Sequence, residues 1–375
     1  MKLLCAGPTS IDKRVMDAMG QFLTNPDLDP EYTKFHRNVE KKISKLLKTE
    51  ATSFLMLGEA IMGLEGAVCS LMERGERVLV LHNGYFGKGF SDYVERYGGK
   101  AVELKFDYRR GIDLKKLNEF LDKDSDFSIA TFVHCETPSG ITNSIKEIAG
   151  ALNKRGILTI VDSVSAIGGE EINFDEDKVD ILIGGSQKCL SAPVGLTTIT
   201  ISQRAKEKIA KRKTKVSSYY LNFENYYNYT YDSFDFPYTM NENLVYALNM
   251  ALDILFEKDS INLHKKYAES TRKTIEKAGL KLYPLDSHSN TVTAVLSPEG
   301  IDAREITRKM REHGMIISGS IQDIEDKVFR IGHMGNNINK ENFIELFQKL
   351  DIVFEELGVK LKTSLKDQFE KEINK

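Results

Sequence analysis

Short apolar runs alternate with amphipathic segments over the first 210 residues, and this alternation restricts the fold more than any other feature. Runs such as "RVLVLH" (77–82), "SIATFVHC" (128–135) and "ILTIVD" (157–162) have the length of buried strands. The segments between them, such as "SIKEIAGALNKRG" (144–156), carry apolar residues at helical spacing. Strands that alternate with helices predict an α/β fold, with a largely parallel sheet covered on both faces.

The composition changes near residue 217, where a stretch rich in Tyr, Phe and Asn begins. Helical patterns near 242–257 and 262–279 follow, and then short apolar strands separated by further helices. This pattern predicts a smaller α+β domain after a boundary near Asn243. The charged tail "KTSLKDQFEKEINK" (362–375) is expected to fray.

Charge and composition argue against several classes of protein. The net charge is −3, so there is no global electrostatic case for binding nucleic acid or an anionic membrane. No apolar run approaches eighteen residues, and "MKLLCAGPTS" lacks the apolar region of a signal peptide, so we expect a soluble cytoplasmic protein. The four cysteines are scattered without CxxC or histidine clusters, which predicts buried reduced thiols for most of them and no metal site.

Polar residues gather at the ends of the predicted strands. In parallel sheets, ligands bind beyond the carboxyl ends of the strands. The segments at these positions offer helix-start amides, an aromatic ring, a hydroxyl, a carboxylate and an amine; they are "GEA" (58–60), "NGYFG" (83–87), "CETPSG" (135–140), "DSVS" (162–165) and "GGSQK" (184–188).

Pyridoxal phosphate is one ligand that uses all five groups. Its ring stacks on an aromatic side chain, and an aspartate keeps its pyridine nitrogen protonated. Its aldehyde forms a Schiff base with a lysine amine. Its phosphate favours the amides at a helix N-terminus. The strand ends therefore predict a pyridoxal-phosphate site.

The chain resembles the class V aminotransferases of the fold-type I pyridoxal-phosphate superfamily, in particular the alanine–glyoxylate, serine–pyruvate and ureidoglycine–glyoxylate transaminases. The motifs that carry the resemblance lie in the same order along residues 6–335; they are "AGPT", "VDSVSAIGG", "GGSQKCLSAPVGL", "RKTK" and "RIGHMG". The 26 positions from Asp162 to Lys188, and the 25 from Thr137 to Asp162, also fit that group.

This resemblance implies an architecture. We expect a large domain with a mostly parallel seven-stranded sheet flanked by helices, plus a smaller C-terminal α+β domain. The expected divisions are residues 1–15 as a segment over the active site, 16–243 as the cofactor-binding domain and 244–375 as the small domain. The family's architecture also implies a homodimer that shares its active sites.

Roles at the cofactor ring are implied by the resemblance, residue by residue. Lys188 would form the Schiff base and later move a proton between the substrate α-carbon and the cofactor, and Asp162 would pair with the ring nitrogen. Phe86 would stack on the ring, with Tyr85 as a rival, and Thr137 would place its hydroxyl beside it. Each has a plainer alternative: a surface charge for Lys188, a helix cap for Asp162, core packing for Phe86 and a turn for Thr137.

The phosphate loop departs from the family. The chain reads "MLGEAIMG", with Glu59 where a small hydroxyl donor is common. A carboxylate beside a phosphate is repulsive. We therefore expect the amides of Ala60 and Ile61 to bind the phosphate, with Glu59 turned aside or toward a basic group. Gln187 would assist them.

Two further positions match residues of the family's binding site. Thr239 would reach the phosphate of the neighbouring subunit, whereas Phe236 stands where the family often has a tyrosine and could not donate. Arg330 would clamp the substrate carboxylate, because a guanidinium binds it bidentately, and Gly7 would lie close by. An ion pair is the plainer alternative for Arg330.

The implied reaction is a ping-pong transfer from alanine or serine to glyoxylate or pyruvate. A 2-aminoethylphosphonate–pyruvate transaminase is an alternative, for which "RKTK" (212–215) could supply charge. A desulfurase or lyase is less favoured, since no cysteine follows Cys189; a non-catalytic dimeric scaffold and a dinucleotide enzyme also lack support. The tyrosine-rich residues 219–238 suggest a substrate mouth or dimer interface. His134 and His333 lie beside matched motifs and could line the site, but we favour a structural role for each.

Overall fold

A seven-stranded sheet forms the centre of the larger part of the molecule, in a computed structural model that describes residues 1–21, 24–228 and 238–375. β10 runs antiparallel to both of its neighbours, and the remaining pairs are parallel. This confirms the predicted mostly parallel α/β sheet. In spatial order the strands are β2 (Thr52–Leu57), β10 (Leu196–Ile201), β9 (Ile181–Gly185), β8 (Leu158–Asp162), β5 (Ile129–Val133), β3 (Arg77–His82) and β4 (Lys100–Lys105).

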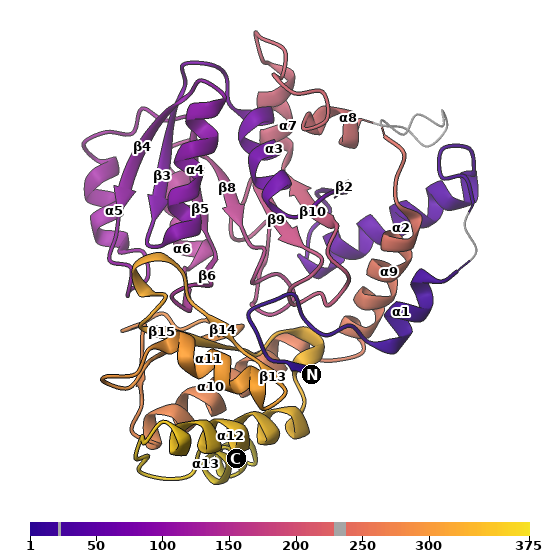
Figure 1. The fold of residues 1–375 in the computed structure, drawn as a ribbon. Helices are drawn as coiled ribbons and strands as arrows, with labels where there is room; N and C mark the ends of the chain where they lie inside the picture. Colours follow the sequence, from indigo (N-terminus) through magenta and orange to yellow (C-terminus); the bar gives the residue numbers. More distant parts are fainter. Residues whose placement is uncertain (22–23, 229–237) are drawn as a thin grey trace.

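Helices cover both faces of this sheet (Figure 1). Alternate side chains of one strand enter different cores: Leu79 and Leu81 pack on one face, and Val78 and Val80 on the other. The first face is covered by α2 (Pro30–Leu46), α5 (Leu114–Leu121), α6 (Ile145–Asn153) and α9 (Glu242–Phe256). The second is covered by α3 (Ile61–Leu71), α4 (Tyr85–Arg96), α7 (Gln203–Ala210) and α8 (Phe223–Tyr227).

The C-terminal part carries its own four-stranded antiparallel sheet and core. Its strands, in spatial order, are β11 (Lys281–Leu282), β12 (Val292–Leu296), β15 (Val328–Gly332) and β14 (Ser318–Gly319). Its helices are α10 (Ser260–Lys277), α11 (Ala303–Glu312), α12 (Lys340–Glu356) and α13 (Leu365–Ile373). We keep the divisions at residues 15 and 243 as proposals. The shorter elements are α1 (Lys13–Met19), β6 (Cys135–Glu136), β7 (Ile141–Thr142), η1 (Gln322–Ile324) and η2 (Gly335–Asn337).

The expectation that the C-terminal tail frays is wrong. Residues 365–373 form α13, which packs against α10 and α12. Its apolar residues recur every fourth position, so Leu365, Phe369 and Ile373 lie on one face and are buried in the small core. The many charged residues between them obscured this stripe.

All four cysteines are buried and free, as the sequence predicted. Over the described parts of the chain, every helix is too short or too polar to span a bilayer.

The N-terminal segment joins the small sheet to the centre of the molecule. β1 (Lys2–Leu3) pairs in parallel with β13 (Met315–Ile316), and the amide of Gly332 donates to the carbonyl of Leu4 at 2.8 Å. Farther along, the amide of Thr9 donates to the carbonyl of Gln187 at 3.0 Å. The segment therefore reaches the end of β9 while it is anchored on β15.

Gly332 is expected to be essential for this anchoring. A Cβ atom at Gly332 would lie 1.9 Å from the carbonyl oxygen of Cys5, a contact that only backbone movement can relieve. We predict that Gly332→Ala destabilises the protein by about 1–3 kcal/mol and loosens residues 2–9. Hydrogen exchange followed by mass spectrometry should show faster exchange in this segment.

Gly319→Ala is the matched control in the same sheet, because no atom lies within 4 Å of a Cβ added there. It should leave the exchange of residues 2–9 unchanged. Protection of the segment that equals wild type in Gly332→Ala would contradict the anchoring.

Candidate active site

Two adjacent parallel strands, β8 and β9, deliver the two most specific residues of the sequence to one edge of the sheet. Asp162 is the last residue of β8, and Lys188 lies three residues beyond the end of β9. The positive charge of Lys188 lowers the pKa of Asp162, so the two groups are close enough to interact. The structure thus brings together the carboxylate and the amine that the sequence singled out.

Lys188 is held by the N-terminal segment. Its Nζ donates to the carbonyl oxygen of Ala6 at 2.6 Å. Desolvation lowers the pKa of Lys188, and the nearby cation Arg330 lowers it further. Gly7 lies directly on the lysine: its φ is +87°, and an added Cβ would come within 2.4 Å of the lysine Cδ. The sequence analysis did not identify the Ala6 carbonyl, since any residue could supply it.

Asp162 is a buried carboxylate with only part of its hydrogen-bonding capacity used. It is 6% exposed, and its Oδ1 accepts a hydrogen bond from the amide of Val164 at 2.9 Å. No other donor within the described ranges reaches it. Burial raises the pKa of Asp162 to about 6, and the negative charge of Glu59 contributes. A protonated ring nitrogen would supply the missing partner.

Arg330 projects from the middle of β15, where it pairs with Ala294 and Ser318. Its Nε donates to the carbonyl oxygen of Gly319 at 2.7 Å. Burial lowers the pKa of Arg330 to about 10. Within the described residues no carboxylate forms a salt bridge with this guanidinium. The alternative role of Arg330, as a partner in an ion pair, therefore has no support. The two terminal nitrogens are left for a ligand.

Phe86 and Tyr85 begin α4 and point to different surroundings. Phe86 is 42% exposed, so its ring has a free face on which a flat ligand could stack. Tyr85 packs edge-on against Tyr108 with ring centroids 5.6 Å apart, and it joins a small cluster with Val328. Tyr85 therefore has a packing role already, which supports Phe86 as the stacking residue.

Glu136 anchors the start of α4, a role that no motif in the sequence indicated. Its buried carboxylate accepts the amides of Gly87 at 2.6 Å and Phe86 at 3.3 Å. Burial raises the pKa of Glu136 to about 7, whereas the two amides act in the opposite direction. A Cβ at Gly84 would lie 2.4 Å from the Glu136 Cδ. The two glycines of "NGYFG", Gly84 and Gly87, could have indicated a side chain packed closely against this segment, since they leave room for Glu136.

Thr137 lies next to Glu136 and is also buried. Its hydroxyl contacts the hydroxyl of Ser165 at 3.3 Å. Ser165 comes three residues after Asp162, so this contact ties the "CETPSG" turn to the end of β8. The hydroxyl of Thr137 is therefore at the same edge of the sheet as the carboxylate, where our prediction needs it.

The side chain of Glu59 does not have the orientation that we predicted. It neither turns aside nor pairs with a basic group: its Oε2 accepts the amide of Ile61 at 2.9 Å, and its Oε1 accepts from Gln187 Nε2 at 2.8 Å. The amide of Ile61 and the side chain of Gln187 are both groups that we assigned to the phosphate. The carboxylate of Glu59 turns toward the start of α3 because the free backbone amides of a helix N-terminus attract an anion. The side chain of Ala60 is buried in the core below.

The hydroxyl of Thr239 forms its hydrogen bond outside the predicted site. It donates to Asp27 Oδ2 at 2.7 Å, in the segment before α2. Phe236 lies within residues 229–237 of the tyrosine-rich stretch, which are outside the described residues.

His134 and His333 are buried and form hydrogen bonds inside the protein. His134 Nδ1 contacts the hydroxyl of Ser163 at 3.1 Å, and His333 Nε2 contacts the hydroxyl of Thr293 at 2.8 Å. Burial lowers the pKa of each to about 3, so both are neutral at physiological pH. These contacts support the structural interpretation.

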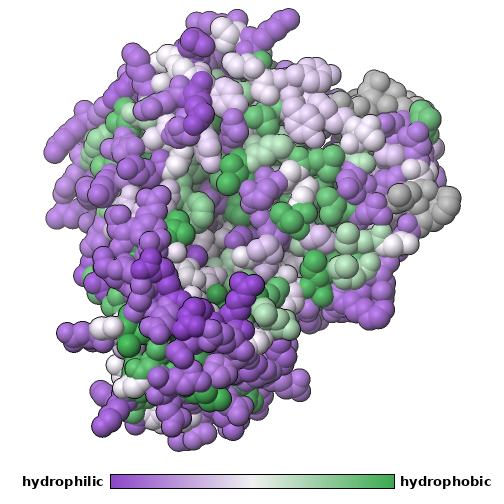
Figure 2. Space-filling model, viewed as in Figure 1, coloured by the Kyte–Doolittle hydropathy of each residue, from purple (hydrophilic) through white to green (hydrophobic). Residues whose placement is uncertain are grey.

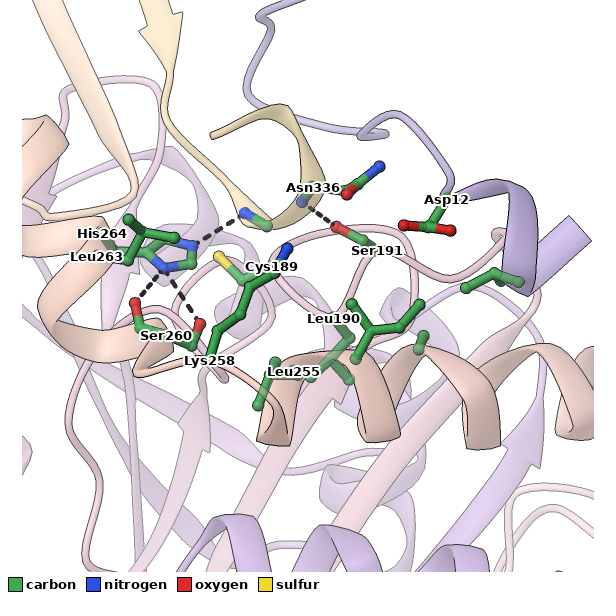
Figure 3. A pocket seen from close by; sticks show the side chains of 14 residues that line it. Asp12, Cys189, Leu190, Ser191, Leu255, Lys258, Ser260, Leu263, His264 and Asn336 are labelled. Carbon is green, nitrogen blue, oxygen red and sulfur yellow. Dashed lines mark hydrogen bonds between the residues drawn. The ribbon is translucent and has the colours of Figure 1, made fainter. Parts of the chain in front are cut away.

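A small cavity beside residues 189–191 lies where this loop meets the small domain (Figure 3). His264 Nε2 accepts the amide of Gly335 at 2.9 Å, and its Nδ1 donates to the carbonyl of Ser260 at 2.7 Å. The hydroxyl of Ser191 accepts the amide of Asn336 at 2.8 Å. The hydrogen bond between Ser191 and Asn336 therefore ties the loop after Lys188 to the small domain, and His264 fixes the neighbouring Gly335.

The pyridoxal ring fits the arrangement around Asp162 and Lys188. The carboxylate of Asp162, which accepts one hydrogen bond, suits a protonated ring nitrogen. The partly buried amine of Lys188 suits an aldehyde, and the exposed ring of Phe86 suits a stacked heterocycle. At the other end, the amide of Ile61 would receive a phosphate only in competition with Glu59.

Comparison with known proteins gives consistent similarities. The family model described as Aminotransferase class-V matches residues 2–321. An uncharacterized aminotransferase of Methanocaldococcus jannaschii is 34% identical over 96% of this chain and 94% of its own length. A serine–glyoxylate aminotransferase of Methylorubrum extorquens is 33% identical over 96% and 92%. The crystal structure of a pyridoxamine–pyruvate aminotransferase from Mesorhizobium loti superposes with a TM-score of 0.93 at 28% identity, over 100% of this chain and 97% of that one.

The positive charge of Arg330 is expected to control the basicity of Lys188. Because Arg330 lowers the pKa of Lys188, removal of its charge in Arg330→Gln should raise that pKa. The pH at which Lys188 is half-maximally acetylated by acetic anhydride, measured by peptide mass spectrometry, should therefore move upward. Arg330→Lys keeps the charge and should hold the midpoint near wild type. An unchanged midpoint in Arg330→Gln would contradict the coupling.

Proposed function

The chain belongs to the class-V aminotransferase family, and we propose that it moves an amino group from alanine or serine to glyoxylate or pyruvate. Pyridoxal 5′-phosphate is the cofactor, and the reaction is transamination between a small amino acid and an oxo acid. Glyoxylate and pyruvate as acceptors are supported by the names of the serine–glyoxylate and pyridoxamine–pyruvate relatives. The observation that carries the proposal is the grouping of buried Asp162 with the partly buried Lys188 and Arg330, none of which forms a salt bridge within the described parts of the chain.

The cofactor, when bound, supplies an electron sink for the negative charge that develops at the amino-acid α-carbon. Asp162 would keep the ring nitrogen protonated, since an ionised carboxylate beside it raises the pKa of that nitrogen. Once free, Lys188 would accept the proton from the α-carbon. Its lowered pKa favours the neutral amine that a base requires.

Substrate orientation would depend on Arg330. Its terminal nitrogens fit a carboxylate bidentately, and an anion there would also offset the repulsion between Arg330 and Lys188. Gly7 closes over Lys188, so the N-terminal segment would limit the space beside the α-carbon. This close cover supports small amino acids such as alanine and serine.

A homodimer is part of the proposal. Thr239 contacts Asp27 rather than its own site, as expected of a residue that serves a neighbouring subunit. The apolar residues Met16, Leu28, Ile61 and Val194 are exposed. Figure 2 shows hydrophobic surface over the middle of one face, between α3 and the pair formed by α1 and α9. Such a surface supports contact with a second copy. The four free thiols support a cytoplasmic, reducing location.

The alternative, transamination of 2-aminoethylphosphonate, gains no support from the "RKTK" segment. Arg212 donates to the carbonyl of Ser70 at 3.2 Å, and the amide of Lys213 donates to Glu73 at 2.9 Å. Both contacts lie at the C-terminal end of α3, a helix of 11 residues. At 1.5 Å per residue, that end is about 16 Å from the helix start beside Glu59.

The proposed function is tested by a panel of amino donors assayed against glyoxylate and pyruvate. Wild type should transaminate alanine or serine, and Lys188→Ala should lower kcat by about 10³-fold or more, because the proton transfer loses its base. Lys146→Ala removes an exposed lysine and serves as the control. Full activity in Lys188→Ala, or no transfer from any donor, would refute the proposal.

Acid pH should weaken cofactor binding through Asp162. Since the pKa of Asp162 in the free protein is raised to about 6, its carboxylate is mostly ionised at pH 7 and mostly protonated at pH 5. Only the ionised form attracts the protonated ring, so the affinity for pyridoxal phosphate should fall about tenfold between these values. Titration by absorbance measures it. The Asp162→Asn variant should bind pyridoxal phosphate weakly, and its affinity should depend less on pH. If the affinity of this variant falls as steeply between pH 7 and pH 5 as that of wild type, a group other than Asp162 causes the effect.

A further inference from the structure

The start of α3 is occupied by a negative charge that belongs to the protein itself. Glu59 accepts the amide of Ile61 at 2.9 Å and the Gln187 Nε2 at 2.8 Å. In the described chain, neither contact of this carboxylate is with a lysine or an arginine. The helix start that would bind the phosphate therefore already carries an unneutralised anion.

Gln187 adds an acceptor at the same place. Its side chain is 4% exposed, and its Oε1 is buried without a hydrogen-bond partner. The reverse orientation of the amide would place this oxygen against the carboxylate of Glu59, which is unfavourable. A Cβ at Gly185 would lie 3.0 Å from Oε1 and 3.3 Å from the Ala60 Cβ, so this oxygen is at the loop before α3.

The two side chains thus present oxygen acceptors to whatever occupies this end of the site. A phosphate dianion offers only acceptors and negative charge, so it would meet repulsion from Glu59 and no donor for Gln187 Oε1. A hydroxymethyl group is neutral and carries an O–H that can donate to either oxygen. A buried acceptor left unsatisfied is unfavourable, which also favours the hydroxyl.

We propose that this site binds the unphosphorylated vitamers pyridoxal and pyridoxamine at least as tightly as pyridoxal phosphate, because Glu59 and Gln187 form a pocket for a neutral hydroxymethyl group. The inference rests on the proposed transaminase function, since the same Lys188 and Asp162 hold the ring. It assigns Glu59 the role of selecting the 5′ substituent.

A consequence is that a vitamer without its phosphate anchor can exchange with solvent between half-reactions. Pyridoxamine would then be an amino donor in its own right. Its amino group and two electrons pass to the oxo acid, which becomes the amino acid. The carbonyl oxygen of the oxo acid leaves as water when the amine condenses with it, and a second water supplies the aldehyde oxygen of pyridoxal on hydrolysis. No further oxidant or reductant is required.

Binding is measured with purified protein freed of any vitamer, titrated separately with pyridoxal and pyridoxal phosphate. Visible absorbance reports the covalent link to Lys188, and borohydride reduction with peptide mass spectrometry locates it. Wild type should bind pyridoxal with a Kd equal to or below that for pyridoxal phosphate. Glu59→Gln, which keeps the shape and removes the charge, should tighten pyridoxal phosphate by about tenfold or more while pyridoxal changes little. Glu59→Ser should act in the same direction.

Glu65→Gln is the matched control, since it removes a charge from α3 that is hydrogen-bonded to Tyr97 instead. It should leave both affinities unchanged. A wild type that prefers pyridoxal phosphate by tenfold or more, or a Glu59→Gln variant with unchanged affinity for it, would overturn this inference and leave transamination intact. Failure of both ligands to link to Lys188 would overturn the inference and the proposed function together.

Discussion

Three charged groups that lie wholly or partly buried, and that form no salt bridge within the described residues, dominate this site. Lys188 donates to a neutral carbonyl, Arg330 donates to another, and Asp162 accepts one backbone amide. Burial without full compensation destabilises a charged group, and the result is the lowered pKa of both cations and the raised pKa of the acid. A zwitterionic amino acid and a protonated pyridine ring together carry the complementary charges, which is what the proposed function requires of this site.

The architecture that sustains these charges draws on distant parts of the sequence. The sheet supplies Asp162 and Lys188 from adjacent strands, the small domain supplies Arg330, and the N-terminal segment crosses from one to the other (Figure 1). Hydrogen bonds of Gly332 with Leu4, and of Thr9 with Gln187, fix that crossing. The closeness of Gly7 to Lys188 is thus a result of packing between the two domains.

Sequence reasoning could predict the features that depend on strand ends, and it could not predict those that depend on three-dimensional contacts. The α/β sheet was predictable from the alternation of strands and helices, and Asp162 and Lys188 stood out because both come after buried runs. Glu136 was missed because its partners are backbone amides of a segment 50 residues earlier. The orientation of Glu59 could not be deduced either, since it depends on Gln187, which is distant in sequence and adjacent in space.

The central claim is that position 188 is the covalent attachment point for a pyridoxal ring oriented by Asp162. The most direct measurement is borohydride reduction of the protein with bound pyridoxal phosphate, followed by proteolysis and mass spectrometry of every lysine-containing peptide. The account predicts one stoichiometric adduct, on the peptide that contains Lys188. Label spread over exposed lysines, or a stoichiometric adduct at a different lysine, would contradict it.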